Sequence, residues 1–212
     1  MVIIAIICGI GCKKDAPKPS NGAPSSADSY LPVTAGSSWT YAVNTKYSSD
    51  TVTVKMNTTN VTENGKTYYT ANSTSKHSGS TGIYFYEKDH IYAIHSFNIY
   101  ADTVLDLQLY NDTASLNKGW ISTPTDNGKV GNVPIQVVST ITQRGLTKVF
   151  SGKTYTNVVQ VEVDIQYNQG FGFSDTNIYV YYLTKGIGIL GYTSTFNDEA
   201  SEDEEIISSD VK

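Results

Sequence analysis

The sequence predicts an all-β protein whose antiparallel sheet curves strongly into an open barrel or half-barrel, with a β-sandwich as the alternative. The chain of 212 residues contains 16 Tyr, 25 Thr and 22 Ser, and Tyr and Thr favour pleated strands. Apolar and polar residues alternate with a period of two between turn signals, without a convincing helical stripe. Many short strands at this spacing are typical of antiparallel barrels and sandwiches. Long strands with one apolar face favour the curved barrel.

The predicted strands follow one another through residues 30–212, which we expect to form one β domain. Asn64-Gly65 is the strongest hairpin signal, because this pair favours a tight two-residue turn. Gly186 and Gly188 flank a second tight turn, where glycine supplies a backbone angle that other residues avoid. The expected strands are residues 39–47, 51–61, 67–76, 83–87, 90–97, 104–110, 133–144, 146–150, 156–167, 177–183 and 187–196.

The alternating apolar faces and the tight hairpin predict the core. The clearest alternation lies in residues 156–167, where one face is apolar and the other carries Glu162 and Asp164. Successive side chains of a strand point to opposite faces of the sheet, so we expect these two acids to be exposed. The expected inward-facing set is Trp39, Tyr41, Val159, Val161, Val163, Ile165, Ile187 and Ile189.

Residues 1–11 predict a bacterial lipoprotein signal peptide. This apolar segment is far shorter than the about 20 residues that a transmembrane helix needs, and it lies at the N-terminus as a signal sequence does. Cys12 follows the small residue Gly11, whereas Cys8 follows the bulky Ile7, so Cys12 is the predicted lipidation site. No Lys or Arg precedes the segment, and we therefore expect the natural start to lie upstream.

A lipidated Cys12 makes the membrane the expected partner. We expect the protein to be held in the outer membrane on its periplasmic or surface-exposed face. Residues 12–29 combine this cysteine with a tether rich in Pro and Ser, which has no apolar periodicity to bury. Both cysteines of the chain lie within the first 12 residues, so the domain is expected to contain no disulfide and no reactive thiol.

The charge distribution argues against nucleic acid as a partner. The net charge is −5, and residues 197–212 hold seven acids and one Lys, so the remainder is nearly neutral and has no basic face. The acidic run is expected to be a solvated loop that leads to a last strand at residues 206–211. A calcium site at residues 198–205 is the alternative, although the ligand spacing of a calcium loop is missing.

Several apparent chemical motifs do not match their structural context. Residues 186–191 read G-x-G-x-x-G, but a strand pattern follows where dinucleotide binding requires a helix. His90 and His95 are expected on opposite faces of one strand, and His77 lies apart from them. We therefore expect no cofactor-binding, metal-ligating or catalytic residue.

Tyrosines offer a stronger indication of function. They cluster around two predicted hairpins, and Tyr combines a broad apolar ring with a polar tip that suits glycan or amphiphile contact. The alternative is that Tyr is present as a good strand residue. The clusters are Tyr84, Tyr86 and Tyr92 in one hairpin, and Tyr179, Tyr181 and Tyr182 in the other.

Three short motifs resemble those of small uncharacterised lipoproteins from Bacteroidetes-type bacteria. They are residues 31–41 (LPVTAGSSWTY), residues 152–159 (GKTYTNVV) and residues 181–190 (YYLTKGIGIL). The Cys-Lys-Lys-Asp sequence that begins at Cys12 is common in that family too. The resemblance implies export, lipidation and an antiparallel half-barrel, and it transfers no functional residue.

Two classes of function remain open from the sequence. The first is a non-enzymatic binding or structural module for an apolar or amphipathic ligand, or for another envelope protein. The second is an envelope glycan hydrolase. Its best candidates are Glu162 and Asp164, which lie about 7 Å apart along one strand, within the range of glycosidase carboxylate pairs. A deep apolar interior favours the module, and a cleft in which acids converge favours the enzyme.

Overall fold

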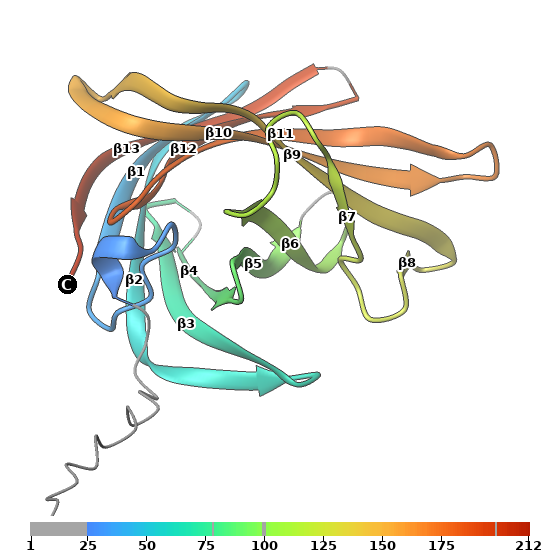
Figure 1. Ribbon diagram of the computed structural model, residues 1–212, viewed down its shortest axis with the longest axis horizontal. Helices are drawn as coiled ribbons and strands as arrows, with labels where there is room; N and C mark the ends of the chain where they lie inside the picture. Colours follow the sequence, from blue (N-terminus) through green and yellow to red (C-terminus); the bar gives the residue numbers. More distant parts are fainter. Residues whose placement is uncertain (1–24, 78, 99–100, 198) are drawn as a thin grey trace, which may run out of the picture.

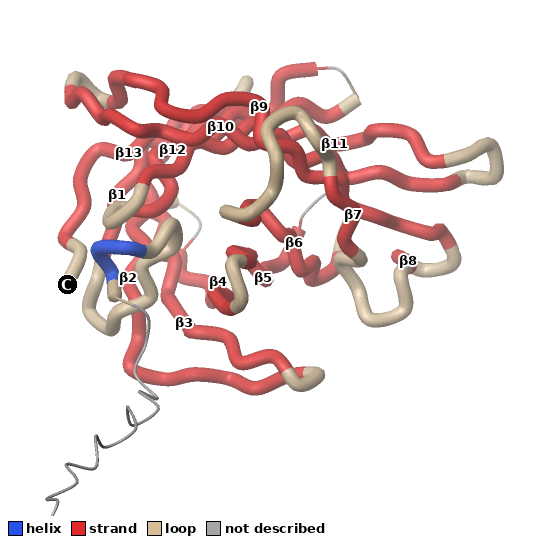
Figure 2. Tube along the Cα trace, viewed as in Figure 1, coloured by secondary structure: helices blue, strands red, loops and turns tan. Residues whose placement is uncertain are grey.

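The structure is a computed structural model that describes residues 25–77, 79–98, 101–197 and 199–212. The predicted signal peptide, Cys12 and the tether up to residue 24 lie outside the described residues. One short 3-10 turn, η1 (Ser26–Asp28), precedes the strands. In the described part of the chain every other regular element is a β-strand, as the two views of the molecule show (Figures 1 and 2).

Thirteen strands in the described ranges form one antiparallel sheet, in the order β6-β5-β4-β3-β2-β1-β13-β12-β11-β10-β9-β7, with β8 paired to β9. The strands are β1 (Ser38–Thr45), β2 (Ser49–Glu63), β3 (Lys66–Ser75), β4 (Gly79–Lys88), β5 (Ile91–Asn98), β6 (Thr103–Asn111), β7 (Trp120–Ser122), β8 (Lys129–Val130), β9 (Val133–Phe150), β10 (Lys153–Asn168), β11 (Phe173–Thr184), β12 (Gly188–Phe196) and β13 (Glu199–Asp210).

The sheet curves around one interior and nearly closes, which confirms the predicted all-β, open-barrel class. In Figure 1, β9 to β13 form the upper wall and β2 to β6 the lower part. The two ends of the sheet meet without a continuous ladder. The Ser139 hydroxyl of β9 donates to the Gln108 carbonyl of β6 (2.6 Å), and the Asp106 amide donates to the Pro124 carbonyl (2.8 Å). These isolated bonds leave one seam in the barrel.

The acidic C-terminal run is a strand, so the prediction of a loop there is wrong. β13 begins at Glu199 and pairs with β1 on one side and β12 on the other. Each of these neighbours would otherwise present an unpaired edge of backbone donors and acceptors. Backbone pairing therefore outweighs the preference of the acidic side chains for water.

Two further predicted boundaries move for local reasons. His90 was expected to begin a strand but lies in the β4–β5 turn with a φ of 69°, so β5 starts at Ile91. The two strands predicted on either side of Gly145 are one strand, β9, in which Gly145 has a φ of 69°. Glycine adopts this angle without steric cost, so the strand passes through it.

Most of the predicted core is confirmed. Trp39 and Tyr41 are buried, as are Val159, Val161, Val163 and Ile165 on the inner face of β10. Ile187 and Ile189 are only partly buried, and Leu190 is fully buried beside them. The predicted alternation fails in this hairpin because Gly186 and Gly188 both have positive φ values, 74° and 100°, which change the direction of the chain.

The segment before β1 packs against the barrel. Ser29 is buried, its hydroxyl donates to Glu87 (2.9 Å), and its carbonyl accepts from the Gly186 amide (2.9 Å). Tyr30 packs against Tyr110 at 4.6 Å between ring centroids. These contacts join the segment to β4, β6 and the β11–β12 turn, so it positions Leu31 and Pro32 at one end of the interior.

Candidate functional site

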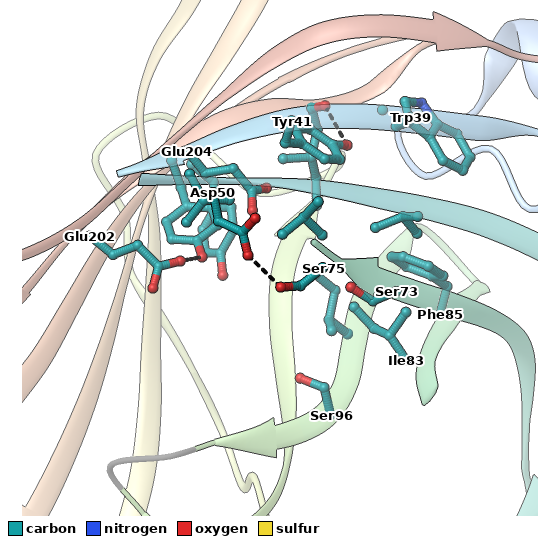
Figure 3. A pocket seen from close by; sticks show the side chains of 18 of the residues that line it. Trp39, Tyr41, Asp50, Ser73, Ser75, Ile83, Phe85, Ser96, Glu202 and Glu204 are labelled. Carbon is teal, nitrogen blue, oxygen red and sulfur yellow. Dashed lines mark hydrogen bonds between the residues drawn. The ribbon is translucent and has the colours of Figure 1, made fainter. Parts of the chain in front are cut away.

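A cavity of about 440 Å³ lies inside the barrel, between β1–β6 and β11–β13. This volume falls in the range of small-molecule sites. The cavity has an apolar wall with a few polar groups, as Figure 3 shows for part of its lining. Its apolar lining includes Leu31, Trp39, Val52, Val54, Ile83, Phe85, Ile94 and Leu107.

The register of the strands makes the cavity apolar at one end and acidic at the other. β1 contributes Trp39, Tyr41, Val43 and Thr45 in that order to the lining. Trp39 pairs with Val54 of β2, Tyr41 with Val52, and Val43 with Asp50. The lining of these two strands therefore changes from apolar to polar toward the β1–β2 turn.

The apolar end is fixed by Trp39. Its indole N–H donates to the carbonyl of Ile187 (2.6 Å), which joins β1 to the hairpin between β11 and β12. A Cβ on Gly188 would lie 3.1 Å from the Pro32 ring, so the lack of a side chain lets the segment before β1 approach this hairpin. Leu31, Pro32 and Trp39 together close this end of the cavity.

The acidic end is a cross-strand row. Val43 of β1 pairs with Asp50 of β2 on one side and with Glu204 of β13 on the other. Glu204 pairs in turn with Tyr192 of β12, which pairs with Tyr181 of β11. All five side chains line the cavity. One step further along β1 and β13, Thr45 and Glu202 form the next row.

Gly191 allows β12 to approach β13 at this point. A Cβ at Gly191 would overlap the backbone oxygen of Glu204, and the residue has a φ of 154°. Any side chain there would push the two strands apart. Gly191 is therefore required to hold Glu204 beside Tyr192.

Hydrogen bonds hold the Asp50 carboxylate in its ionised form. Its Oδ2 atom accepts from the Ser75 hydroxyl and from the His77 amide (3.4 Å), and its Oδ1 atom accepts from the Thr51 amide (2.7 Å) and lies 3.0 Å from His77 Nδ1. The Ser75 bond is the main cause that lowers the Asp50 pKa to about 2. Asp50 is thus a fixed negative charge at the acidic end (Figure 3).

Burial, together with the nearby carboxyls of Glu202 and Asp203, raises the pKa of Glu204 to about 8. Glu204 lines the cavity and keeps part of its surface open to it. Among the described residues none donates a hydrogen bond to this carboxyl. Near neutral pH Glu204 is therefore mostly protonated, in contrast to the ionised Asp50.

The sequence did not reveal Glu202, Glu204 and Asp50 as site residues. In the run Ser201-Glu202-Asp203-Glu204-Glu205 every residue is polar, so its strand periodicity is invisible. The alternation becomes apparent only from the pairing of β13, which turns Glu202 and Glu204 into the cavity. Asp203 and Glu205 lie on the opposite face.

One of the two predicted tyrosine clusters contributes to the cavity. Tyr181 lines it together with Tyr192, and their rings lie 5.1 Å apart between centroids. Tyr182 points to the other face, where Lys148 lies over its ring. Tyr84 and Tyr86 alternate with Ile83 and Phe85, which line the cavity, and so they face away from it.

The histidines are dispersed over the molecule. His77 contacts Asp50, His90 contacts Asp112 (2.6 Å), and His95 lies 3.8 Å from Glu63. Within the described ranges no group of three His, Cys, Asp or Glu side chains is placed to hold a metal ion. Of the segment considered for calcium, residue 198 lies outside the described residues, and β13 sends its successive acids to opposite faces of the sheet.

The hydrolase candidates Glu162 and Asp164 lie on the outer face of β10 and do not line the cavity. Both are half-buried, so the expectation that they are exposed is wrong. Long polar side chains of three strands cover this face: Gln166 of β10 contacts Gln136 of β9 (2.6 Å) and Asp175 of β11 (2.7 Å). Burial, with Glu162 and Asp175 nearby, raises the Asp164 pKa to about 7.

In the described part of the chain, no helix has the length and apolar character needed to cross a membrane. No family model matches the chain, and no curated protein matches it.

Two solved structures share the fold. One is an exported protein with a YmcC-like fold from Bacteroides fragilis (TM-score 0.54, 10% identity, 86% of this chain and 99% of that chain). The other is a lipoprotein from Parabacteroides distasonis (TM-score 0.57, 10% identity, 87% of this chain and 99% of that chain). Both descriptions are provisional, and at this identity the likeness establishes the fold alone. The chain thus has a fold found in two Bacteroidetes proteins that are described as exported and as a lipoprotein.

Proposed function

We propose that this protein is an envelope lipoprotein, anchored in the outer membrane through Cys12, that binds a small apolar or amphipathic molecule inside its barrel without transforming it. The observation that carries the proposal is the cavity of about 440 Å³, which is apolar at the end of Trp39 and polar at the end of Asp50. Binding sites for small molecules are typically concave and largely apolar, with a few polar groups that orient the ligand. Contact with another envelope protein is the other form of such a module.

A glycan hydrolase is the second candidate, because the cavity holds two carboxyls with opposite pKa shifts. The pKa of Glu204 is raised to about 8 and the pKa of Asp50 is lowered to about 2. Such a separation of pKa values is typical of a catalytic acid and base pair. The oxygens of Asp50, however, are occupied by Ser75, Thr51 and His77. A base with occupied oxygens is poorly placed to take a proton from water, and we therefore favour the binding module.

The binding proposal is tested by filling the cavity. Ser73 of β3 lines it, whereas the adjacent Thr74 is exposed on the opposite face. We expect native mass spectrometry of the protein, extracted mildly from its own envelope, to detect a retained small molecule in the parent and in Thr74→Phe. Ser73→Phe should have lost it. A bare polypeptide mass in all three proteins, together with no saturable uptake of decanol, contradicts the proposal. Turnover of an envelope glycan that disappears in Glu204→Gln favours the hydrolase.

The anchor is tested separately. Cys12→Ala is expected to abolish incorporation of labelled palmitate and to leave the chain unprocessed or misplaced, because the variant lacks the cysteine that carries the lipid. Cys8→Ala is the matched control and should be lipidated normally. Equal palmitate incorporation with and without Cys12 contradicts the lipoprotein assignment. It does not bear on the proposal that the cavity binds a ligand.

A further inference from the structure

The charged residues that line the cavity are all acidic. Among the residues that the structure describes, the lining contains Asp50, Glu202 and Glu204 and includes no Lys, Arg or His. His77 reaches Asp50 from outside the lining, and its side chain is mostly exposed. An anionic group entering the acidic end would meet at least one fixed negative charge and no basic side chain of the lining.

Aromatic rings accompany the three acids. Tyr192 and Tyr181 occupy the same cross-strand row as Glu204, and Tyr41 lies one step away on β1. The Tyr41 hydroxyl donates to the Ile189 carbonyl (3.1 Å), which holds its ring in place. Carboxylates together with aromatic faces attract organic cations, because the faces of the rings carry partial negative charge.

We propose that the molecule bound in the barrel carries a protonated amine or quaternary ammonium head group at Asp50, Glu202 and Glu204, with its apolar part directed toward Trp39 and Leu31. This assignment rests on the proposed binding function and names the class of ligand. The carboxyl of Glu204 is available as an acceptor for such a group, because none of the described residues donates a hydrogen bond to it. At Glu202, one oxygen accepts from the Tyr192 hydroxyl.

Binding of a cation beside Glu204 is coupled to the release of the proton that this carboxyl holds. Its neighbours are Tyr41 on β1, Asp50 on β2, Tyr181 on β11, Tyr192 on β12, and Glu202 and Asp203 on its own strand; each of them is an acid or a neutral phenol. His77 contacts Asp50 at the rim. Without ligand, Glu204 holds its proton until about pH 8. A bound cation favours the ionised carboxylate, so the proton passes to the buffer on binding.

The direction of the pH dependence follows from this release. Below about pH 8 the cation must displace the Glu204 proton, so its affinity rises as the pH rises, by at most about tenfold per unit. The rise ends near pH 8. An alkylamine remains charged there, since its pKa is similar to the ~10.4 of a Lys side chain.

Three chain-matched probes test the head group by calorimetry on the full chain: decylamine, decanol and decanoate. We expect decylamine to bind about tenfold or more tightly than decanol, as for a hydrogen bond to a charged group, and decanoate to bind more weakly than decanol. Titrations in two buffers of different ionisation enthalpy should show proton release for decylamine at pH 7 and none for decanol.

Glu204→Gln keeps the shape of the side chain and removes its charge. It should abolish the proton release and flatten the pH dependence of decylamine binding. Glu205→Gln, on the same strand but facing outward, should behave as the parent. If decanol binds as well as decylamine in the parent, the binding function stands and the cation assignment is overturned. If none of the three probes binds, the cation assignment is overturned, and with a bare polypeptide mass in native mass spectrometry the binding function is overturned as well.

Discussion

Replacing Trp39 with Ala is expected to lower the free energy of unfolding by about 3–5 kcal/mol, as for other large-to-small changes of buried aromatic residues. Trp39 is 5% exposed, and its indole joins β1 to the β11–β12 hairpin through the Ile187 carbonyl. Alanine would lose both the packing and this bond, and it would enlarge a cavity that already lies beside the ring. A loss of this size is a large share of the stability of a typical domain.

Urea unfolding followed by circular dichroism measures this effect. Trp39→Phe retains most of the packing and should cost about 1 kcal/mol, mainly the hydrogen bond. Trp120→Ala is the control, since Trp120 lies on the short strand β7 at the end of the sheet and is only half-buried. Equal losses for Trp39→Ala and Trp120→Ala would show that the apolar end of the cavity contributes little to stability.

Glu204→Gln is expected to stabilise the protein at alkaline pH. The Glu204 pKa is about 8 in the folded protein against a usual 4.5. Below pH 4.5 both the folded and the unfolded states hold the proton, so the group contributes nothing to the pH dependence. Between pH 4.5 and about 8 the unfolded state releases the proton while the folded state retains it. The parent therefore loses stability as the pH rises through this window.

The full shift corresponds to at most ~5 kcal/mol. Partial exposure of the Glu204 side chain reduces it, so we expect a gain on the order of 2–3 kcal/mol for Glu204→Gln above pH 8. Asp164 and Glu87 have pKa values raised to about 7, mainly by burial, so they also change the stability of the fold in an overlapping pH range. The informative quantity is therefore the difference between the parent and the variant, measured by chemical unfolding from pH 4 to 9. Glu205→Gln should show no such difference. A pH-independent effect of Glu204→Gln would mean that Glu204 is ionised in the folded protein.

Asp50 affects the stability of the fold in a separate, more acidic pH range, and there stability falls as the pH falls. Its pKa is about 2 in the folded protein against a usual 3.8, so its contribution is present above pH 3.8 and is lost as the pH falls toward 2. The effects of Asp50 and Glu204 on stability can therefore be distinguished by pH alone.

Strands in which successive residues differ strongly in polarity could be predicted from the sequence. Residues 156–167 alternate cleanly, and the structure buries Val159, Val161, Val163 and Ile165 on one face of β10. Asn64-Gly65 forms the turn between β2 and β3, with φ values of 49° and 76°. In these places the local pattern and the fold agree, because burial of one face and the turn geometry are both encoded within a few residues.

The site could not be predicted in the same way. Its acids come from β2 and β13, about 150 residues apart in the chain, and β1 brings them into one row. Glu202 and Glu204 lie in a polar run with no contrast between its two faces, and the run resembles a loop until its partners are known. Conversely, Glu162 and Asp164 have clear spacing on one strand but lie outside the cavity.

The sequence by itself determined the all-β class, most strand positions, the inner face of β10 and the prediction of a lipid anchor at Cys12. Those properties depend on the alternation, turn residues and short motifs of neighbouring positions. The tertiary structure alone decided that the acidic run is strand β13, that it lies between β1 and β12, and that two of its acids face the interior. The physical reason is that pairing of exposed backbone edges acts between distant segments, and at β13 it outweighs the solvation of the side chains.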